Sequence, residues 1–390
     1  MQFKLDFQAI FGKAADQLFA LALTHPDTFQ GAARPILQGQ SDGDIRKARA
    51  LALEGLRTYL HVVQQHSERF LHRYSDTISY EELRIPLAGR WITPVGTACG
   101  VDTDADGLEP LSYLFGFQMP GPITLRATQG EPAPFQDDSR RNDLYVPVTL
   151  SSRGLDYALE RLRQYRDAGG RAVILPALAT GFHDPLDAGR ATEELATMAA
   201  SLRPYVDGFV WVPFGSADFT VGARVMCEHA EDRLRLVEMP AYREDEREIW
   251  LDRVAAFLSA GGQGVVAVHG LEVPREKLPQ PKTWPFETAL WCGASMADYR
   301  QRAIEDVRRA FPSAFIIASG GFHHRDEAFR AIEYANAIAE TEAFTRFGPG
   351  LAPVLLNKLA LRLKFLHRQG QIDSVNLHAY QRQRWGKLAG

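Results

Sequence analysis

The sequence of 390 residues predicts an α/β protein, a TIM (β/α)8 barrel with an N-terminal helical extension. Eight short apolar runs follow one another from about residue 90, amphipathic helical segments separate them, and the first 85 residues have helical periodicity. Eight βα units over about 280 residues fit a closed barrel better than an open, doubly wound sheet. We therefore divide the chain into an extension, 1–85, and a barrel domain, 86–390.

The composition limits the functions that need to be considered. Forty-eight acidic and 44 basic residues give a formal charge of -4 without a basic run, so we do not expect nucleic acid as a partner. Three widely spaced cysteines without a CxxC pair favour a reducing cytoplasm over a disulfide framework. The sequence contains no run of about 18 consecutive apolar residues, the length that could span a bilayer.

The extension has apolar residues at helical spacing in 14–23 and 45–74, and the residues SDGD before Ile45 are typical of a helix cap. Its first segment, residues 1–30, is rich in phenylalanine and could pack on the barrel or lie on a membrane surface. Packing is favoured because Lys4 and Lys13 provide little basic flank. Peripheral contact with the inner membrane face stays open as the alternative.

The eight apolar runs are the expected barrel strands. They are WITPVGTAC (91–99), PITLR (122–126), AVILPAL (172–178), GFVWVPF (208–214), LRLVEMP (234–240), GVVAVHG (264–270), AFIIASGG (314–321) and NAIAET (336–341). The helical segments 155–170 and 244–262 each end in Gly-Gly, a common helix stop. Residues 129–150 are expected to form a loop excursion with a small hairpin. No internal sequence repeat stands out.

Polar residues follow several of these runs, at the ends where a barrel enzyme carries its chemistry. They include Asp102, Thr103, Ser216, Asp218, Glu238, His269 and Thr341, and the seventh run itself ends in two glycines, Gly320 and Gly321. Ser216 could be a general base or could cap a turn, and Asp218 could be the base instead. Asp218, Glu238, His269 and His323 are metal-ligand types, but they form no HxH or HxxE pair, so we expect no metal site.

Several motifs occur in the order found in one enzyme family. They are TPVGTACGVDTD (93–104), LFGFQMPGPITLRATQGEPAP (114–134), VPFGSADFTVG (212–222), LWCGASM (290–296), IIASGGF (316–322) and FTRFGPGLAPVLLNKLALRL (344–363). Together they resemble the dihydroorotate dehydrogenases, which are FMN-containing barrels, over nearly the whole chain. The serine in the third motif and the helical extension are similar to the membrane-associated, quinone-reducing branch of that family.

The resemblance implies a role for each matching position. It makes Ser216 the catalytic base, with Asp218 beside it. It implies cofactor contacts from Ala98, Gly100, Gly293, Gly320, Gly321 and Thr341, and substrate contacts from Thr103, Glu131 and His269. It also places Glu238, Pro176 and Pro213 where the family has ligands of the flavin or the substrate.

Two functions follow from the resemblance and its departures. The first is an FMN-dependent oxidoreductase that passes a hydride from a small substrate to FMN and electrons to a quinone or another acceptor. The alternative is an inactive barrel that has lost flavin chemistry and serves as a binding or scaffolding protein. The sequence leaves both open.

Overall fold

The structure is a computed structural model that describes residues 80–129, 134–138, 140–147, 150–180, 188–213, 218–267, 270–322, 325–341 and 351–386, together with positions 44, 47, 50, 53, 54 and 57. Most of the predicted extension, and strand-end residues such as Ser216 and His269, lie outside this set. Among the described positions of the extension, Lys47, Ala50, Leu53, Glu54 and Arg57 are helical. The proposed boundary at residue 85 stays a prediction.

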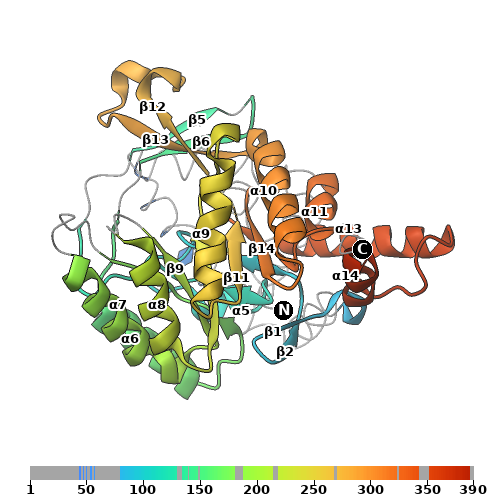
Figure 1. Ribbon diagram of the computed structural model, residues 1–390, viewed down its shortest axis with the longest axis horizontal. Coiled ribbons are helices and arrows are strands. Elements are labelled where there is room, and N and C mark those ends of the chain that lie inside the picture. The colour runs from blue at the N-terminus through green and yellow to red at the C-terminus, as the bar shows by residue number, and fades with distance from the viewer. Residues whose placement is uncertain are drawn as a thin grey trace, which may run out of the picture.

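A parallel sheet forms the centre of the molecule, surrounded by helices (Figure 1). Its strands are β3 (Val95–Thr97), β4 (Phe117–Gln118), β7 (Val173–Ile174), β8 (Ala177–Ala179), β9 (Gly208–Val212), β10 (Leu234–Met239), β11 (Gly264–Ala267), β14 (Phe315–Gly320) and β15 (Ala337–Glu340). They pair in the order β7-β4-β3-β15-β14-β11-β10-β9-β8. The two ends of this order, β7 and β8, are consecutive pieces of one strand, so the sheet closes into an eight-stranded barrel.

Proline explains why that strand is divided. Pro176 lies between β7 and β8 and has no N–H to donate to a ladder. Its carbonyl still accepts from the Val210 N–H at 3.0 Å, and the Ala177 N–H donates to the Pro120 carbonyl at 2.7 Å. The strand therefore keeps contact with both neighbours across the interruption, and the predicted barrel is confirmed.

The helices alternate with the strands and cover the outside of the barrel. They are α5 (Leu108–Ser112), α6 (Leu155–Asp167), α7 (Ala188–Leu202), α8 (Phe219–Ala230), α9 (Arg247–Ser259), α10 (Ala297–Ala310), α11 (Arg325–Ile332), α13 (Leu351–Arg368) and α14 (Leu377–Gly386). Short 3-10 turns are η1 (Glu81–Leu83), η3 (Arg203–Tyr205), η4 (Glu244–Glu246), η5 (Arg275–Lys277), η6 (Pro281–Thr283) and η7 (Ala294–Met296). As expected, α6 ends at a glycine pair, where Gly169 has a φ of +85°.

Two small antiparallel sheets accompany the barrel. One is the hairpin of β1 (Ile85–Leu87) and β2 (Arg90–Ile92). The other joins β5 (Gln136–Asp138), β6 (Asp143–Val146), β12 (Leu271–Pro274) and β13 (Thr288–Gly293) in the order β12-β13-β6-β5. Its two hairpins follow β4 and β11 in the chain, so this sheet lies on the carboxyl side of the barrel (Figure 1). The hairpin expected within 129–150 is therefore present as β5 and β6.

Two of the eight predicted strands are misplaced. The run 91–99 divides at Thr93–Pro94, because β2 pairs with β1 and only Val95–Thr97 enters the barrel. In the second unit the barrel strand is Phe117–Gln118, upstream of the predicted run, and within 122–126 only Ile123 forms a bridge, to Leu178. Prolines at both places lack the N–H that a longer ladder needs.

Strand register fixes which side chains face the barrel interior. Trp211 packs against Phe219 of α8 and Phe257 of α9, with ring centroids 4.9 and 6.3 Å apart, so it faces the helices. Side chains alternate along a strand and paired residues share a face. Because Val237 pairs with Trp211, its neighbour Glu238 must face the interior. On the far side, Gln118 donates to a carbonyl of α5, which leaves Phe117 facing inward.

The interior is filled in layers. Following the paired residues from Glu238 once around the barrel leads back to the level of position 230 on the same strand, β10. This offset of eight residues is the shear number of a TIM barrel. A plane perpendicular to the barrel axis therefore crosses each next strand one residue beyond the residue that the register pairs with the previous strand. In each such plane, alternate strands contribute the inward-facing side chains. Near the amino ends the layer consists of Phe117 with Gly208, Gly264 and Ala337, so one large ring lies among small residues.

Candidate functional site

The inner layer near the carboxyl ends of the strands contains the first polar groups of the barrel interior. The registers place Glu238 of β10 in one plane with Ser319 of β14, Ala98 just after β3 and Ala177 of β8. The next layer towards the mouth includes Val212 and Thr341. The layers nearer the amino ends are apolar, so Glu238 and Ser319 form the floor of the candidate site.

Both polar side chains of this floor are buried. Glu238 is 9% exposed and Ser319 is 1% exposed. Within the part of the chain that the structure describes, the Ser319 hydroxyl has no hydrogen-bond partner. A buried hydroxyl without a partner is unfavourable by about 1 to 3 kcal/mol, and such groups often mark the place of a ligand or an ordered water. Ala98 and Ala177 beside them have small side chains.

Four of the predicted cofactor residues come together at the adjoining strand ends. The Thr341 N–H donates to the Gly320 carbonyl at 3.4 Å, and the Ala98 N–H donates to the carbonyl of Glu340 at 2.9 Å. Gly320 has a φ of +134°, which residues other than glycine rarely adopt. Gly321 follows directly and is buried. The structure therefore brings Ala98, Gly320, Gly321 and Thr341 to one side of the mouth.

A buried carboxylate lies at this glycine turn. Glu340 is fully buried, and its Oε2 accepts from the Phe322 N–H at 3.4 Å. Backbone N–H groups at a glycine turn are a common phosphate site in barrels. In this protein, the Glu340 carboxylate already accepts from one N–H group of this turn. The sequence analysis assigned no role to Glu340, because it lies inside the expected strand 336–341. An acidic residue within an apolar run was the sign that could have identified it.

The loop after β3 is held by its own aspartate. The Asp102 carboxyl is buried and accepts from the N–H groups of Asp106 and Gly107 at 2.9 and 2.8 Å. Burial raises the pKa of Asp102 to about 7, although both hydrogen bonds act in the opposite direction. The Asp102 carbonyl accepts from Gly121, whose own carbonyl accepts from Gly100 at 2.8 Å. Gly100 is thus part of a rigid loop.

Thr103, predicted to contact the substrate, is half-buried in the same loop. Its hydroxyl donates to Oδ2 of Asp104 at 3.5 Å, a long contact. The Asp104 Oδ1 accepts from the Arg153 N–H at 2.8 Å. Burial, the largest effect, raises the pKa of Asp104. These contacts connect the loop to the start of α6, and the substrate role of Thr103 stays a prediction.

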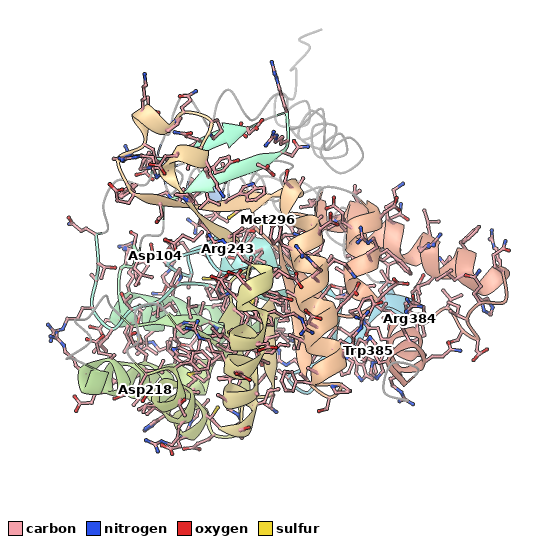
Figure 2. The ribbon with its side chains drawn as sticks, turned by 45° about the horizontal axis from the view of Figure 1, so that its top comes forward. Asp104, Asp218, Arg243, Met296, Arg384 and Trp385 are labelled. Atoms are coloured by element: carbon pink, nitrogen blue, oxygen red, sulfur yellow. The ribbon has the colours of Figure 1, made fainter. Side chains whose placement is uncertain are left out.

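Asp218 has a structural task in the fold. It is the N-cap of α8, where its Oδ1 accepts from Thr220 and Val221 N–H groups at 2.9 and 3.1 Å. Figure 2 shows Asp218 among the helices, apart from Asp104 and Met296. The cap explains the position of Asp218 without catalysis. Its role as an alternative base gains no support from this geometry.

Gly293 belongs to the small sheet rather than to the ring of strand ends. It ends β13, pairs with Asp143 and has a φ of +121°. A Cβ at this position would lie 2.4 Å from the Asn142 carbonyl oxygen. The glycine is therefore required for the close approach of β6 to β13, whether or not a cofactor lies below.

Three predicted residues, Ser216, Glu131 and His269, lie outside the described part of the chain, as does His323. Their roles stay predictions. Within the described residues, no group of three or more His, Cys, Asp or Glu side chains is arranged to hold a metal ion. In the same part of the chain, no helix combines the length and the apolar character needed to cross a bilayer.

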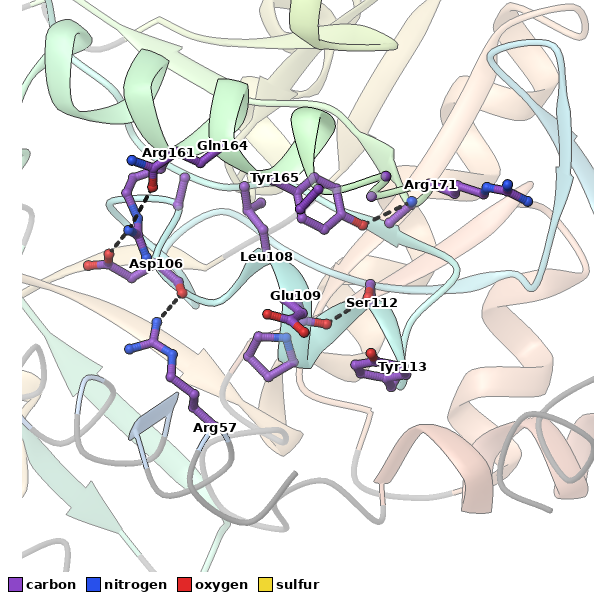
Figure 3. A pocket seen from close by; sticks show the side chains of 16 residues that line it. Arg57, Asp106, Leu108, Glu109, Ser112, Tyr113, Arg161, Gln164, Tyr165 and Arg171 are labelled. Atoms are coloured by element: carbon purple, nitrogen blue, oxygen red, sulfur yellow. Dashed lines mark hydrogen bonds and ion pairs between the residues drawn. The ribbon is translucent and has the colours of Figure 1, made fainter. Parts of the chain in front are cut away.

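A groove of about 540 Å³ lies away from the mouth, on the outer surface between α5 and α6 (Figure 3). Its charged side chains are largely engaged in the fold. Arg161 pairs with Asp106 at 3.1 Å, and Arg57 donates to the Asp106 carbonyl. The groove therefore lies where Arg57 of the helical extension contacts the barrel, and it is separate from the candidate site.

The closed parallel barrel with polar groups at its carboxyl ends places the chain in the TIM-barrel class. Neither a protein-family model nor a curated protein sequence matches it. Among solved structures, it is similar to DHODH from Eimeria tenella in complex with ferulenol, with a TM-score of 0.63 and 18% identity over 80% of this chain and 95% of that one. The ligand-free form gives 0.62 and 18%, over 79% and 97%. The chain has a DHODH-like fold, which confirms the resemblance at the level of the fold.

The residues present do not fit FMN in the way that the resemblance implies. The ring of a reduced flavin and its phosphate are both anionic, whereas Glu238 lies on the floor and Glu340 lies at the glycine turn. Two like charges about 4 Å apart repel by about 4 kcal/mol at an effective dielectric constant near 20. Pro176 and Pro213 add no side-chain hydrogen bond at two further positions. Two buried carboxyl groups therefore lie at the mouth, where an anionic cofactor would need hydrogen-bond donors.

Proposed function

We propose that this chain is a small-molecule-binding barrel that has lost the flavin chemistry of the enzymes whose fold it shares. The observation that carries the proposal is the inward position of Glu238 in the layer near the carboxyl ends of the strands. A carboxylate there faces any ligand that enters the barrel. The second carboxylate, Glu340, is already hydrogen-bonded to the turn on which a flavin phosphate would depend.

An FMN-dependent oxidoreductase with a quinone or another acceptor is the second candidate. The DHODH-like fold supports it, and so does the clustering of Ala98, Gly320 and Thr341. In this function Ser216 would be the base, Glu131 and His269 would contact the substrate, and residues 1–30 would bring the enzyme to a membrane surface. This candidate needs FMN to bind beside two buried carboxylates.

The visible spectrum of the purified full-length protein separates the two. We expect a colourless preparation that does not bind added FMN, because both carboxylates repel it. Removing them by Glu238→Gln and Glu340→Gln together should raise the affinity for FMN at least about tenfold, since each removes a repulsion of a few kcal/mol. Glu248→Gln, on the exposed face of α9, should leave it unchanged.

A yellow preparation with stoichiometric FMN would refute the loss of flavin chemistry and favour the oxidoreductase. In that case Ser216→Ala should abolish reduction of the flavin by substrate if Ser216 is the base. Circular dichroism of each variant would show whether the barrel is intact.

A further inference from the structure

The outer face of α13 combines apolar and basic side chains. This face consists of Lys358, Leu361, Arg362, Phe365 and Arg368, which are exposed or, for Lys358, half-buried. Each of these positions lies three or four residues from another, so they share one side of the helix. The opposite side is lined with buried leucines that pack on the barrel. The packing of α13 on the barrel therefore does not account for the apolar residues of the outer face.

The two apolar side chains of this face form a patch. Leu361 is 51% exposed and Phe365 is 50% exposed, and they are two of the four large hydrophobic side chains with such exposure among the described residues. They lie one helical turn apart, so they are neighbours on the surface. The Arg362 guanidinium lies 5.5 Å from the centroid of the Phe365 ring, which places a positive charge beside the patch.

The end of the chain that includes α13 is strongly basic. Residues 343–390 contain eight lysine and arginine residues and one acid, Asp373, which gives this segment a formal charge of +7, whereas the whole chain has a charge of -4. The helix α13 itself contains no acidic residue. Such a charge asymmetry along a chain is typical of proteins that contact an anionic surface.

The basic residues of the outer face are not neutralised by ion pairs in the described part of the chain. Lys364, beside this face, pairs with Glu82 at 3.1 Å, whereas no ion pair between described residues involves Lys358, Arg362 or Arg368. These three cations surround the apolar patch. An interfacial helix has the same arrangement, with leucine or phenylalanine in contact with the lipid chains and lysine or arginine in contact with the headgroups.

We propose that the outer face of α13 binds the surface of an anionic membrane, with Leu361 and Phe365 inserted between lipids and the three basic side chains at the phosphate groups. Figure 1 shows the carboxyl end of α13 reaching out beyond α11 and α14, which suits contact with a broad surface. A membrane accounts for the apolar centre of the face, which a nucleic acid backbone would not use. This contact is distinct from the one expected for residues 1–30, and it does not depend on the flavin.

Co-sedimentation of the full-length protein with lipid vesicles tests the proposal. We expect binding to vesicles of phosphatidylcholine and phosphatidylserine, mixed at about two to one, and at least about tenfold weaker binding to phosphatidylcholine alone. Raising the salt concentration from about 0.05 M to about 0.5 M should also weaken the binding at least about tenfold, because salt screens the attraction between exposed charges.

Variants assign the binding to α13. Phe365→Gln should weaken it about 10- to 100-fold, the loss expected for one inserted ring. Arg362→Gln combined with Arg368→Gln should weaken it about 25-fold, since each basic residue near an anionic surface contributes about fivefold.

The helix α9 provides matched controls. Ile249 is 61% exposed, and Arg253 of the same helix is also exposed. Ile249→Gln and Arg253→Gln make the same chemical changes on another surface and should leave vesicle binding unchanged. All of these substitutions are at exposed positions, and circular dichroism would show that each variant is folded.

Three results would overturn the proposal. The first is absence of binding to the phosphatidylserine vesicles. The second is binding that persists unchanged in the α13 variants, which would assign it to another surface such as residues 1–30. The third is a dimer in solution that dissociates in Phe365→Gln, because a second copy of the chain would then cover the face. The colour of the protein bears on the flavin question alone, so the two proposals can fail separately.

Discussion

At the scale of single residues, the role of an acid depends on the face of the strand that carries it. Glu238 and Glu340 both lie near the carboxyl ends of barrel strands, and both are buried. The registers place Glu238 inside the barrel, while Glu340 is hydrogen-bonded to the glycine turn. The sequence identified Glu238 through the resemblance and assigned no role to Glu340, because the contact of Glu340 with Phe322 depends on the pairing of β15 with β14.

Asp102 gives a prediction about pH. Its pKa is raised by burial from 3.8 to about 7, so the folded protein holds a proton there that the unfolded chain releases near pH 4. The folded state therefore loses stability relative to the unfolded state as the pH rises from about 4 to about 7. We expect the free energy of unfolding of the wild type, relative to Asp102→Asn, to fall over this range by up to a few kcal/mol.

Urea denaturation at several pH values measures this difference. Asparagine cannot ionise, and its own change in hydrogen bonding with Asp106 and Gly107 does not vary with pH. A difference between the two proteins that stays constant between pH 4 and pH 8 would show that Asp102 is already ionised at low pH.

At the scale of elements, one arginine arrangement occurs twice although the sequence shows no repeat. Near the end of α6, Arg166 donates to the carbonyls of Gly170, Ala172 and Tyr205. Near the end of α10, Arg308 donates to those of Pro312, Ala314 and Tyr334. Each guanidinium also reaches a side chain before the next strand, Asp207 in one case and Asn336 in the other. The shared geometry ties a helix end to the starts of two neighbouring strands.

Arg308 is the more buried member, at 1% exposure, and its guanidinium lies 3.8 Å from the ring centroid of Trp385 in α14. Burial lowers its pKa to about 10. We expect Arg308→Lys to reduce the free energy of unfolding by about 3 kcal/mol, because one ammonium group cannot replace a planar fork that reaches four acceptors. Chemical denaturation measures the loss.

The neighbouring residue provides the control. Arg309 is 58% exposed and pairs with Glu305 at 3.1 Å. Arg309→Lys should change the free energy of unfolding by less than about 0.5 kcal/mol, as for other exposed pairs within a helix. Equal losses from the two substitutions would contradict a specific role for the buried arrangement.

At the scale of the whole molecule, closure of the barrel depends on fitting one large ring among small residues. The Phe117 ring fills the layer near the amino ends, and a Cβ added at Gly96 would lie 2.5 Å from it. We expect Gly96→Ala to reduce the free energy of unfolding by about 1 to 3 kcal/mol, because neither the ring nor the strand can move away. Combining it with Phe117→Leu should recover part of the loss, as measured by a double-mutant cycle.

The opposite result is expected at an exposed glycine. Gly189 begins helix α7, and a Cβ there would meet nothing within 4 Å. Gly189→Ala should stabilise the protein by up to about 1 kcal/mol through helix propensity.

In the double-mutant cycle, additive losses for Gly96→Ala and Phe117→Leu would show that the two side chains do not share one space.

The sequence by itself determined the order of alternating apolar runs and amphipathic helices, and from it the barrel and the strand ends that carry polar residues. These features are local, since each depends on periodicity within one segment. The same pattern misplaced the strands around Pro94 and Pro122, because a ladder also needs N–H donors opposite the right carbonyls.

Only the tertiary structure decided which polar residues act together. Register and shear bring Glu238 and Ser319 into one layer although 81 positions separate them in the chain. The same closure sets Glu340 against the turn of Gly320. Such neighbours are created by the pairing of separate strands and by the shear of the barrel, and no periodicity within a single segment records them.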